Sequence, residues 1–478
     1  MVLHVLVRNC SALIAAFSLS VILTACANQS AKQDPLLSGK MPQEWQSALP
    51  ATENASTMEA WWADWNDPTL LDLLRHAQQH SPNLSIASAR IAQARASATA
   101  SGAALWPALD LNASVIAGHY PLLPNDLRQT VTTTGLDARW EIDLFGAQAA
   151  TRDSMQEKLK ASEYQWHDAR ISLAAEVANT YVAVRSCAAQ LTDITQMLAS
   201  QHLSQRLQQE KIAAGFISAT ELAQYRAVLA STASQQQQQQ SECNSMLKSL
   251  VTLIDMPEPE LRERLKAGPD AIPETGNFIV DTLPAKVLLK RPDIRAAMHQ
   301  LMASAAEINA AQAKRYPSIS LLGSINLYGI RIEGRSANLQ GWSFGPSLNL
   351  PLFDAGARKA DVEHAQARHA QAQAEFRQIS LAAIQEVEVA MLRLDLANRH
   401  LEQHQHIQAA QDQAMQAAQA NWQFGSASLL EREEARRQQL AASEKNWQLQ
   451  RLRASARIAL YKALGGDWQA NEDPPAKS

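Results

Sequence analysis

The residues of this chain that could do chemistry are of three kinds. They are a short run of histidines, four cysteines, and glutamates that lie a few residues after Gly215 and Gly425. His400 and His404 are four positions apart and share one face of a helix, a spacing that suits a metal ion. No third ligand stands beside them, and exposed histidines are common on Gln-rich helices. The sequence also has no nucleophile–base pair, phosphate-binding loop or CxxC motif. We therefore expect no enzyme, no metal site and no catalytic cofactor.

The N-terminus has the pattern of an export signal, because the apolar run 12–23 is short and ends in small residues before Cys26. Such a run is typical of a signal peptide rather than a membrane anchor. Residues 23–26, Leu-Thr-Ala-Cys, resemble the bacterial lipobox; the alternative is an ordinary cleavage site with a chance cysteine. The resemblance implies a signal peptide at 1–25 and diacylglyceryl and N-acyl groups on Cys26. Because Ala27 follows rather than Asp, it also implies the outer membrane.

After cleavage, Cys187 and Cys243 remain in an oxidising compartment. Each lies 28 residues from Gly215, one on each side. If Gly215 is the turn of an antiparallel helical hairpin, the two thiols lie at the same height. A disulfide can then form if the rotation of the helices also suits its geometry. The alternative is two unpaired small residues in the core.

The composition favours long solvated helices over a thick globular core. Aromatic residues make up only 5% of the 478 residues, whereas Ala and Gln are abundant. The net charge of -4 is mild and no basic block is present, so nothing in the sequence indicates a nucleic-acid partner.

The sequence consists of two similar halves. Landmark residues recur 210 positions apart: Pro82 and Pro292, Pro107 and Pro317, Gly215 and Gly425, Glu221 and Glu431. This period is too long for a solenoid repeat. It indicates a duplicated supersecondary unit, so each half should build the same set of elements.

Each half contains one long stretch without Pro or Gly, at 147–214 and 357–424. A continuous helix of that length would reach about 100 Å at about 1.5 Å per residue. The second stretch carries apolar residues at steps of three and four, which indicates coiled-coil packing. We expect shorter helices beyond Gly215 and Gly425, and further helices over 83–105 and 293–315.

Four segments alternate apolar and polar residues with a period of two, at about 109–119, 130–144, 318–330 and 341–352. Polar loops over 121–130 and 331–340 should join them in pairs. This alternation is typical of transmembrane β-strands around a polar lumen, and the alternative is a soluble sheet packed on the helices. Four strands cannot close a barrel, and an open edge in lipid would leave amides unpaired. A membrane barrel must therefore be shared between subunits: three chains give twelve strands and four give sixteen.

Three segments carry a resemblance to a known family. Residues 61–74 (Trp-Trp-Ala-Asp-Trp-Asn-Asp-Pro-Thr-Leu-Leu-Asp-Leu-Leu), 291–294 (Arg-Pro-Asp-Ile) and 350–356 (Leu-Pro-Leu-Phe-Asp-Ala-Gly) resemble outer membrane efflux lipoproteins of the NodT type, within the TolC-like superfamily. The resemblance covers nearly the whole mature chain. It implies a mainly α fold with a membrane β-barrel part, in which long antiparallel helices form an α-barrel and four strands per chain contribute to a trimeric twelve-stranded barrel.

The resemblance also implies a function. The homotrimer would be the passive exit duct of a tripartite pump, carrying drugs or other small toxic solutes, with a periplasmic adaptor (membrane fusion) protein and an inner-membrane transporter as partners. One alternative is a type I secretion duct for proteins, against which the lipobox argues. Another is a periplasmic coiled-coil structural lipoprotein without a pore, against which the alternating strands argue.

On this interpretation the chain has six parts. They are the signal peptide 1–25, a lipidated N-terminal segment 26–66, a first repeat 67–257, an equatorial linker 258–282, a second repeat 283–466 and a C-terminal tail 467–478. Trp61, Trp62 and Trp65 should pack the N-terminal segment along the equator of the helical barrel rather than stack on a ligand.

The family resemblance also places a periplasmic aperture at the two hairpin turns, Gly215 and Gly425. By position from each glycine, Glu221 and Glu431 align with acidic residues at the tip of related ducts, and Glu434 with a second acidic position. A ring of such carboxylates would favour cations and raise some of their pKa values by like-charge crowding. The alternative is an ordinary solvated helix face with ion pairs about one turn apart, formed by Glu431, Glu433 and Glu434 with Arg432, Arg436 and Arg437.

Two further positions follow from the same alignment. Trp422 stands where some relatives have a gate tyrosine, and Ala427 stands where a relative has a gating arginine, so that ionic lock should be absent.

Overall fold

The computed structural model describes most of the chain beyond the N-terminal segment. The described ranges are residues 61–62, 64–120, 127–216, 218–268, 272–273, 290–332 and 335–466. The segment expected to be a signal peptide (1–25), Cys26 and the tail after residue 466 lie outside them.

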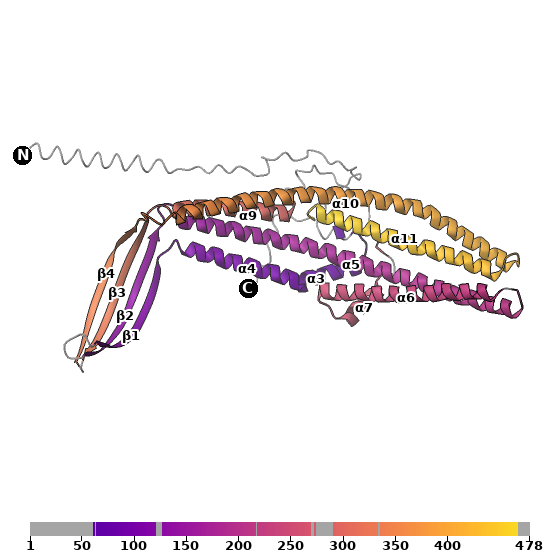
Figure 1. Ribbon diagram of the computed structural model, residues 1–478, viewed down its shortest axis with the longest axis horizontal. Helices are drawn as coiled ribbons and strands as arrows, with labels where there is room; N and C mark the ends of the chain where they lie inside the picture. The colour runs from indigo at the N-terminus through magenta and orange to yellow at the C-terminus, as the bar shows by residue number, and fades with distance from the viewer. Residues whose placement is uncertain are drawn as a thin grey trace, which may run out of the picture. The chain divides into compact units, whose positions relative to one another are not determined.

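The two halves contain matching elements in the same order (Figure 1). The first comprises α4 (Pro82–Ala103), β1 (Ala108–Tyr120), β2 (Leu127–Ile142), α5 (Ala147–Ala213) and α6 (Ala219–Ile254). The second comprises α9 (Pro292–Ala313), β3 (Ser318–Ile332), β4 (Arg335–Asn349), α10 (Ala357–Gln423) and α11 (Leu429–Ala463). Helices α5 and α10 have 67 residues each, and α4 and α9 have 22 each. The expected mainly helical fold with four strands and an internal repeat is confirmed.

Both long helices end in the same turn, at Gly215 (φ 80) and Gly425 (φ 74). This left-handed conformation is costly for residues with a side chain. The N–H groups of Gly215 and Phe216 bond back to the carbonyls of Ile212 and Lys211, and the second turn repeats the pattern. These paired bonds satisfy carbonyls that the helix end would otherwise leave free, so the chain reverses without leaving these carbonyls unpaired.

The strands form one antiparallel sheet in the order β1-β2-β3-β4. Its register places Leu111, Leu136, Ile325 and Trp342 side by side in one row across the sheet. This face is apolar but uncovered, since Leu111 is 71% and Trp342 79% exposed. The outer edges of β1 and β4 have no partner strand among the described residues.

Three strand ends differ from the sequence expectation. Strand β2 stops at Ile142, because the chain turns sharply where the Leu144 N–H bonds to the Ile142 carbonyl. Strand β4 stops at Asn349, shortly before Pro351, which has no N–H to donate. The polar segment 331–340, expected as a loop, instead extends the β3–β4 hairpin, because backbone pairing continues between Leu327–Ile332 and Arg335–Gln340.

The main apolar cluster lies around the middle of α5, between Ile171 and Val182. It includes α3 (Pro68–His80) and a short helix α7 (Glu258–Ala267), which falls within the segment expected to be a linker. Trp61, Trp62 and Trp65 are buried in it, and the Trp61 ring stacks on Tyr461 at 4.3 Å. The three tryptophans thus pack against the helices just before α3 begins.

The two copies of the repeat differ in what covers them. Ile171 and Val182 are 2% and 0% exposed, whereas the residues 210 positions later, Leu381 and Leu392, are 57% and 59% exposed. Helix α10 therefore presents an apolar stripe that no described residue covers.

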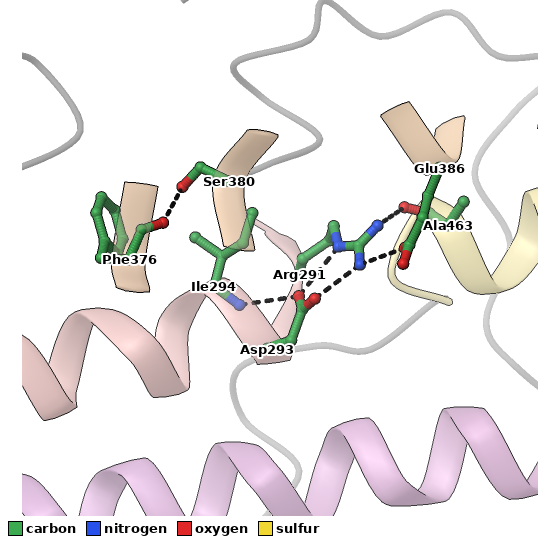
Figure 2. Close-up of polar contacts among 7 residues, drawn as sticks. All are labelled: Arg291, Asp293, Ile294, Phe376, Ser380, Glu386 and Ala463. Atoms are coloured by element: carbon green, nitrogen blue, oxygen red, sulfur yellow. Dashed lines mark hydrogen bonds and ion pairs between the residues drawn. The ribbon is translucent and has the colours of Figure 1, made fainter. Parts of the chain in front are cut away.

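Arg291, from the Arg-Pro-Asp-Ile segment, ties three helices together and is only 6% exposed (Figure 2). Its guanidinium donates to Asp293 at 3.0 and 2.7 Å, to Glu386 of α10 at 2.8 Å and to the Ala463 carbonyl at 2.7 Å. The last bond satisfies an end carbonyl of α11.

None of the described helices has the length and hydrophobicity needed to cross a membrane.

Candidate functional site

The residues expected at the aperture lie at the two hairpin tips, where α6 and α11 begin. Ser218 and Ser428 are the N-caps, and each is three residues before a glutamate. The Glu221 carboxylate accepts the Ser218 N–H at 2.9 Å, and the Glu431 carboxylate accepts the Ser428 N–H at 2.6 Å. Both acids therefore complete capping boxes, so any charge they add to an aperture comes with a structural role.

The pKa directions at the tip are opposite to the expectation from crowding. The backbone N–H of Ser428 lowers the pKa of Glu431. Hydrogen bonds from Gln438 and Arg437 lower the pKa of Glu434. Within one subunit, local donors outweigh burial, and the rise expected from crowding between the carboxylates of several subunits stays a prediction.

Arg437 was expected only as an ion-pair partner on a solvated helix face, and its contact with α5 was not predicted from the sequence. Its side chain is 12% exposed, and it donates to Ser200 Oγ at 3.1 Å and Ser204 Oγ at 2.8 Å, both on α5. Its other nitrogen pairs with Glu434 at 2.5 Å. Arg437 thus joins α11 to the preceding hairpin. The spacing of Ser200 and Ser204 by four residues indicates a polar face on α5, but it does not indicate that Arg437 binds there.

Glu433 is fully buried, which contradicts its placement on a solvated helix face. One of its carboxylate oxygens accepts from Arg432 at 2.9 Å, and the other has no hydrogen-bond partner. Arg432 also bonds to Gln419 at 2.6 Å and lies over the Trp422 ring at 5.0 Å. Trp422 is therefore held by a cation from α11, which fixes α10 to α11 at the tip.

The face of α5 that packs on α11 is polar over much of its length. Six buried polar residues follow a three-and-four spacing: Ser186, Gln190, Asp193, Ser200, Ser204 and Gln208. Asp193 accepts Ser443 Oγ–H at 2.7 Å and Trp447 Nε1–H at 3.1 Å, and burial raises its pKa. We call this row of residues the polar seam.

The contact between α10 and α11 is apolar by comparison, with buried Val387, Met391, Leu394 and Leu401 on α10. Polar contacts stabilise less per residue than apolar burial. Toward the tip, α11 therefore contacts α5 mainly through polar groups and α10 through more apolar ones.

The comparisons with known proteins agree with this geometry. Residues 73–255 and 283–466 match the family model described as outer membrane efflux protein. The chain belongs to this family. This efflux protein is an outer membrane channel of tripartite efflux systems that extends into the periplasm, and it is not an enzyme.

Two relatives and two solved structures illustrate the match. The pyoverdine export outer membrane protein OpmQ of Pseudomonas aeruginosa is 31% identical over 475 residues, covering 96% of this chain and 98% of that protein. Nodulation protein T of Rhizobium leguminosarum bv. trifolii is 27% identical and covers 87% and 89%. The outer-membrane channel OprN superposes with a TM-score of 0.74 at 27% identity, covering 90% of this chain and 98% of that one. CusC superposes with a TM-score of 0.72 at 25% identity, covering 89% and 97%.

The hairpin of α5 and α6 in this efflux protein is cross-linked. Cys187 and Cys243 form a disulfide with an S–S distance of 2.03 Å and a Cα–Cα distance of 5.5 Å.

His404 is buried, with Nε2 2.8 Å from the Ala442 carbonyl, so its ring contributes to the α10–α11 contact. Among the described residues, no three His, Cys, Asp or Glu side chains are grouped to hold a metal ion.

Proposed function

We propose that this efflux protein works as a homotrimer whose three sheets close a twelve-stranded barrel in the outer membrane. The observation that carries the proposal is the sheet itself, which exposes an apolar face and whose edge strands β1 and β4 pair with no further strand in the described part of the chain. Lipid cannot satisfy free backbone amides, so the edges of β1 and β4 must pair with other strands. A second copy of the chain offers the matching edge, and three copies exceed the eight strands of the smallest barrels.

The exposed stripe on α10 supports the same assembly. Leu381, Leu392, Leu396 and Ile407 are between 50% and 59% exposed. An uncovered row of this kind on a long helix is typical of a subunit contact. Burial against a neighbour would extend the helical wall around a common axis.

We propose that the duct passively carries drugs or other small toxic solutes delivered by an inner-membrane transporter and a periplasmic adaptor. Relatives are named for export of pyoverdine, efflux of solvents and toluene, and efflux of cations. All of these cargoes are small. Lipid groups on Cys26 would add a second attachment to the membrane.

The assembly can be tested on purified protein in detergent and in planar bilayers. We expect a trimer mass by native mass spectrometry and discrete conductance steps. A monomer that gives no conductance would refute the duct. Cys26→Ala should abolish labelling by radioactive palmitate, and retained labelling would refute the lipid anchor.

We further propose that the aperture is formed at Gly215 and Gly425, with Glu221, Glu431, Glu434 and Trp422 around it. Glu431→Gln combined with Glu434→Gln removes two charges, while glutamine can still complete the capping box. The pair should reduce cation selectivity in bilayers, because fewer carboxylates face the lumen. Unchanged reversal potentials in a salt gradient would remove these residues from the aperture.

A further inference from the structure

The apolar face of the sheet ends at a defined row. The register gives successive rows of one residue per strand, and the rows from Ile142, Ile319 and Leu348 up to the Trp342 row are apolar. From Ile319 to Ile325, the β3 residue of the Trp342 row, the strand rises about 20 Å at about 3.4 Å per residue. A tilt of about 40° reduces this to about 16 Å of height, which fits within the apolar band of about 25 Å of membrane barrels. The Trp342 ring, 79% exposed, lies near the upper limit of the band, where aromatic girdles occur.

Beyond this row the same face becomes polar, although the strands continue. Its residues there include Thr130, Thr132, Thr134, Arg331, Asn338 and Gln340. These six side chains line an open groove of about 800 Å³. We call it the threonine groove. Its lining residues belong to the parts of β2, β3 and β4 next to the hairpin ends, and these ends of the sheet lie away from the long helices (Figure 1).

Gly329 forms part of the lining of the threonine groove. It lies between Thr132 and Asn338 in its row. A Cβ at this position would be 3.6 Å from Asn338 Oδ1 and 3.7 Å from Thr132 Cβ, which is ordinary contact. A Cβ therefore fits beside both neighbours, and a side chain added here would occupy part of the groove.

The charge of the threonine groove is positive. Arg331 is exposed and has no ion pair within the part of the chain that the structure describes. No described residue of this face beyond the Trp342 row is acidic. The acids of the sheet (Asp110, Asp137 and Glu141) point to the other face and lie nearer the helices. The groove thus combines one guanidinium with hydroxyl and amide groups.

We propose that the threonine groove binds the phosphate-bearing headgroup of a lipid in the outer leaflet, with the acyl chains on the apolar rows next to it. Arginine binds phosphate oxygens in a bidentate manner, and hydroxyl and amide groups complete the set of donors. A lipid whose chains contact Ile325 and Leu327 places its headgroup two to four residues further along the strands, where the groove lies. This lipid site goes beyond the duct function, because it concerns the outer wall and makes no use of a lumen.

The test measures binding of bis-phosphorylated lipid A to the full-length processed protein in dodecyl maltoside by native mass spectrometry. Arg331→Gln should weaken binding about fivefold, the effect of one arginine at an anionic lipid surface. Gly329→Val should also weaken binding, because it fills the groove and leaves every charge in place. Arg139→Gln, the matched control on the other face of the same sheet, should leave binding unchanged.

Three outcomes would overturn the proposal. The first is equal affinity for the wild type and both groove variants. The second is an equal loss in the Arg139→Gln control, which would show a general charge effect. The third is full displacement of lipid A by millimolar inorganic phosphate, which would make the groove a simple anion site. Because Gly329→Val changes no charge and valine is favoured in strands, it keeps the test valid if Arg331→Gln folds poorly.

Discussion

The polar seam should open first when Arg437 is removed. Arg437→Met keeps most of the length and packing of the side chain but deletes the guanidinium that joins α11 to α5. We expect the tip of α11 to separate from α5 more often, while the apolar α10–α11 contact stays intact.

The magnitude follows from the contacts that are lost. Two hydrogen bonds from a charged group, to Ser200 and Ser204, contribute about 1.5 kcal/mol each at the low end of the usual range, or about 3 kcal/mol together. The pair with Glu434 adds less than about 1 kcal/mol, because Glu434 is 56% exposed. A local loss of about 3 kcal/mol corresponds to roughly a hundredfold more opening at this part of the seam.

Hydrogen–deuterium exchange of the first turns of α11 measures this opening directly. The matched control is Arg436→Met, which removes a neighbouring guanidinium whose hydrogen bond to Gln196 is long and weak, at 3.5 Å. The control should change exchange little, and planar-bilayer currents of Arg437→Met should show a higher open fraction. Wild-type exchange rates in Arg437→Met, or an equal increase in the control, would refute the role assigned to Arg437.

Three further predictions concern the disulfide, a buried acid and a helix cap. Replacing Cys187 and Cys243 with serine opens a 56-residue loop and should lower the free energy of unfolding by about 4 kcal/mol. Urea denaturation measures this as a lower midpoint. The control, an alanine variant of an exposed glutamine on α6, should have a higher midpoint than the serine variant. Because burial raises the pKa of Asp193, the folded protein binds this proton at higher pH than the unfolded chain does. Stability should therefore rise as the pH falls from neutral through that raised pKa, level off below the ordinary value of 3.8, and lose this dependence in Asp193→Asn. Ser428→Ala should cost about 1 kcal/mol at the start of α11 and speed amide exchange in its first turn; unchanged exchange there would contradict the capping role.

The helices could be predicted closely from Gly and Pro positions, because both residues interrupt helices for local reasons. The stretch 147–214 without either residue became α5, Ala147–Ala213. The strand ends were less accessible. Polar residues over 335–340 indicated a loop, yet backbone pairing does not depend on side-chain polarity once a hairpin is aligned.

The aperture residues show the same division. The capping role of Glu431 is local and is written in Ser428-Leu-Leu-Glu431. The burial of Glu433 and the bonds of Arg437 are not local, because they depend on α11 lying against a helix more than 200 positions earlier in the chain. No periodicity within α11 reports which face meets that helix.

Equivalent positions in the two copies of the repeat are buried to different extents, so they are under different selective pressures, one for folding and one for assembly. Ile171 and Val182 are buried by their own chain, so substitutions there act in cis on folding. Leu381 and Leu392, their counterparts, are buried only by a neighbour in the proposed trimer, so substitutions there act in trans on assembly. A gene carrying a change at Leu381 would then express a folded protein that competes with wild-type copies for partners. The same change at Ile171 would remove the product before it could interfere. Dominant alleles should therefore accumulate in the second copy and recessive ones in the first.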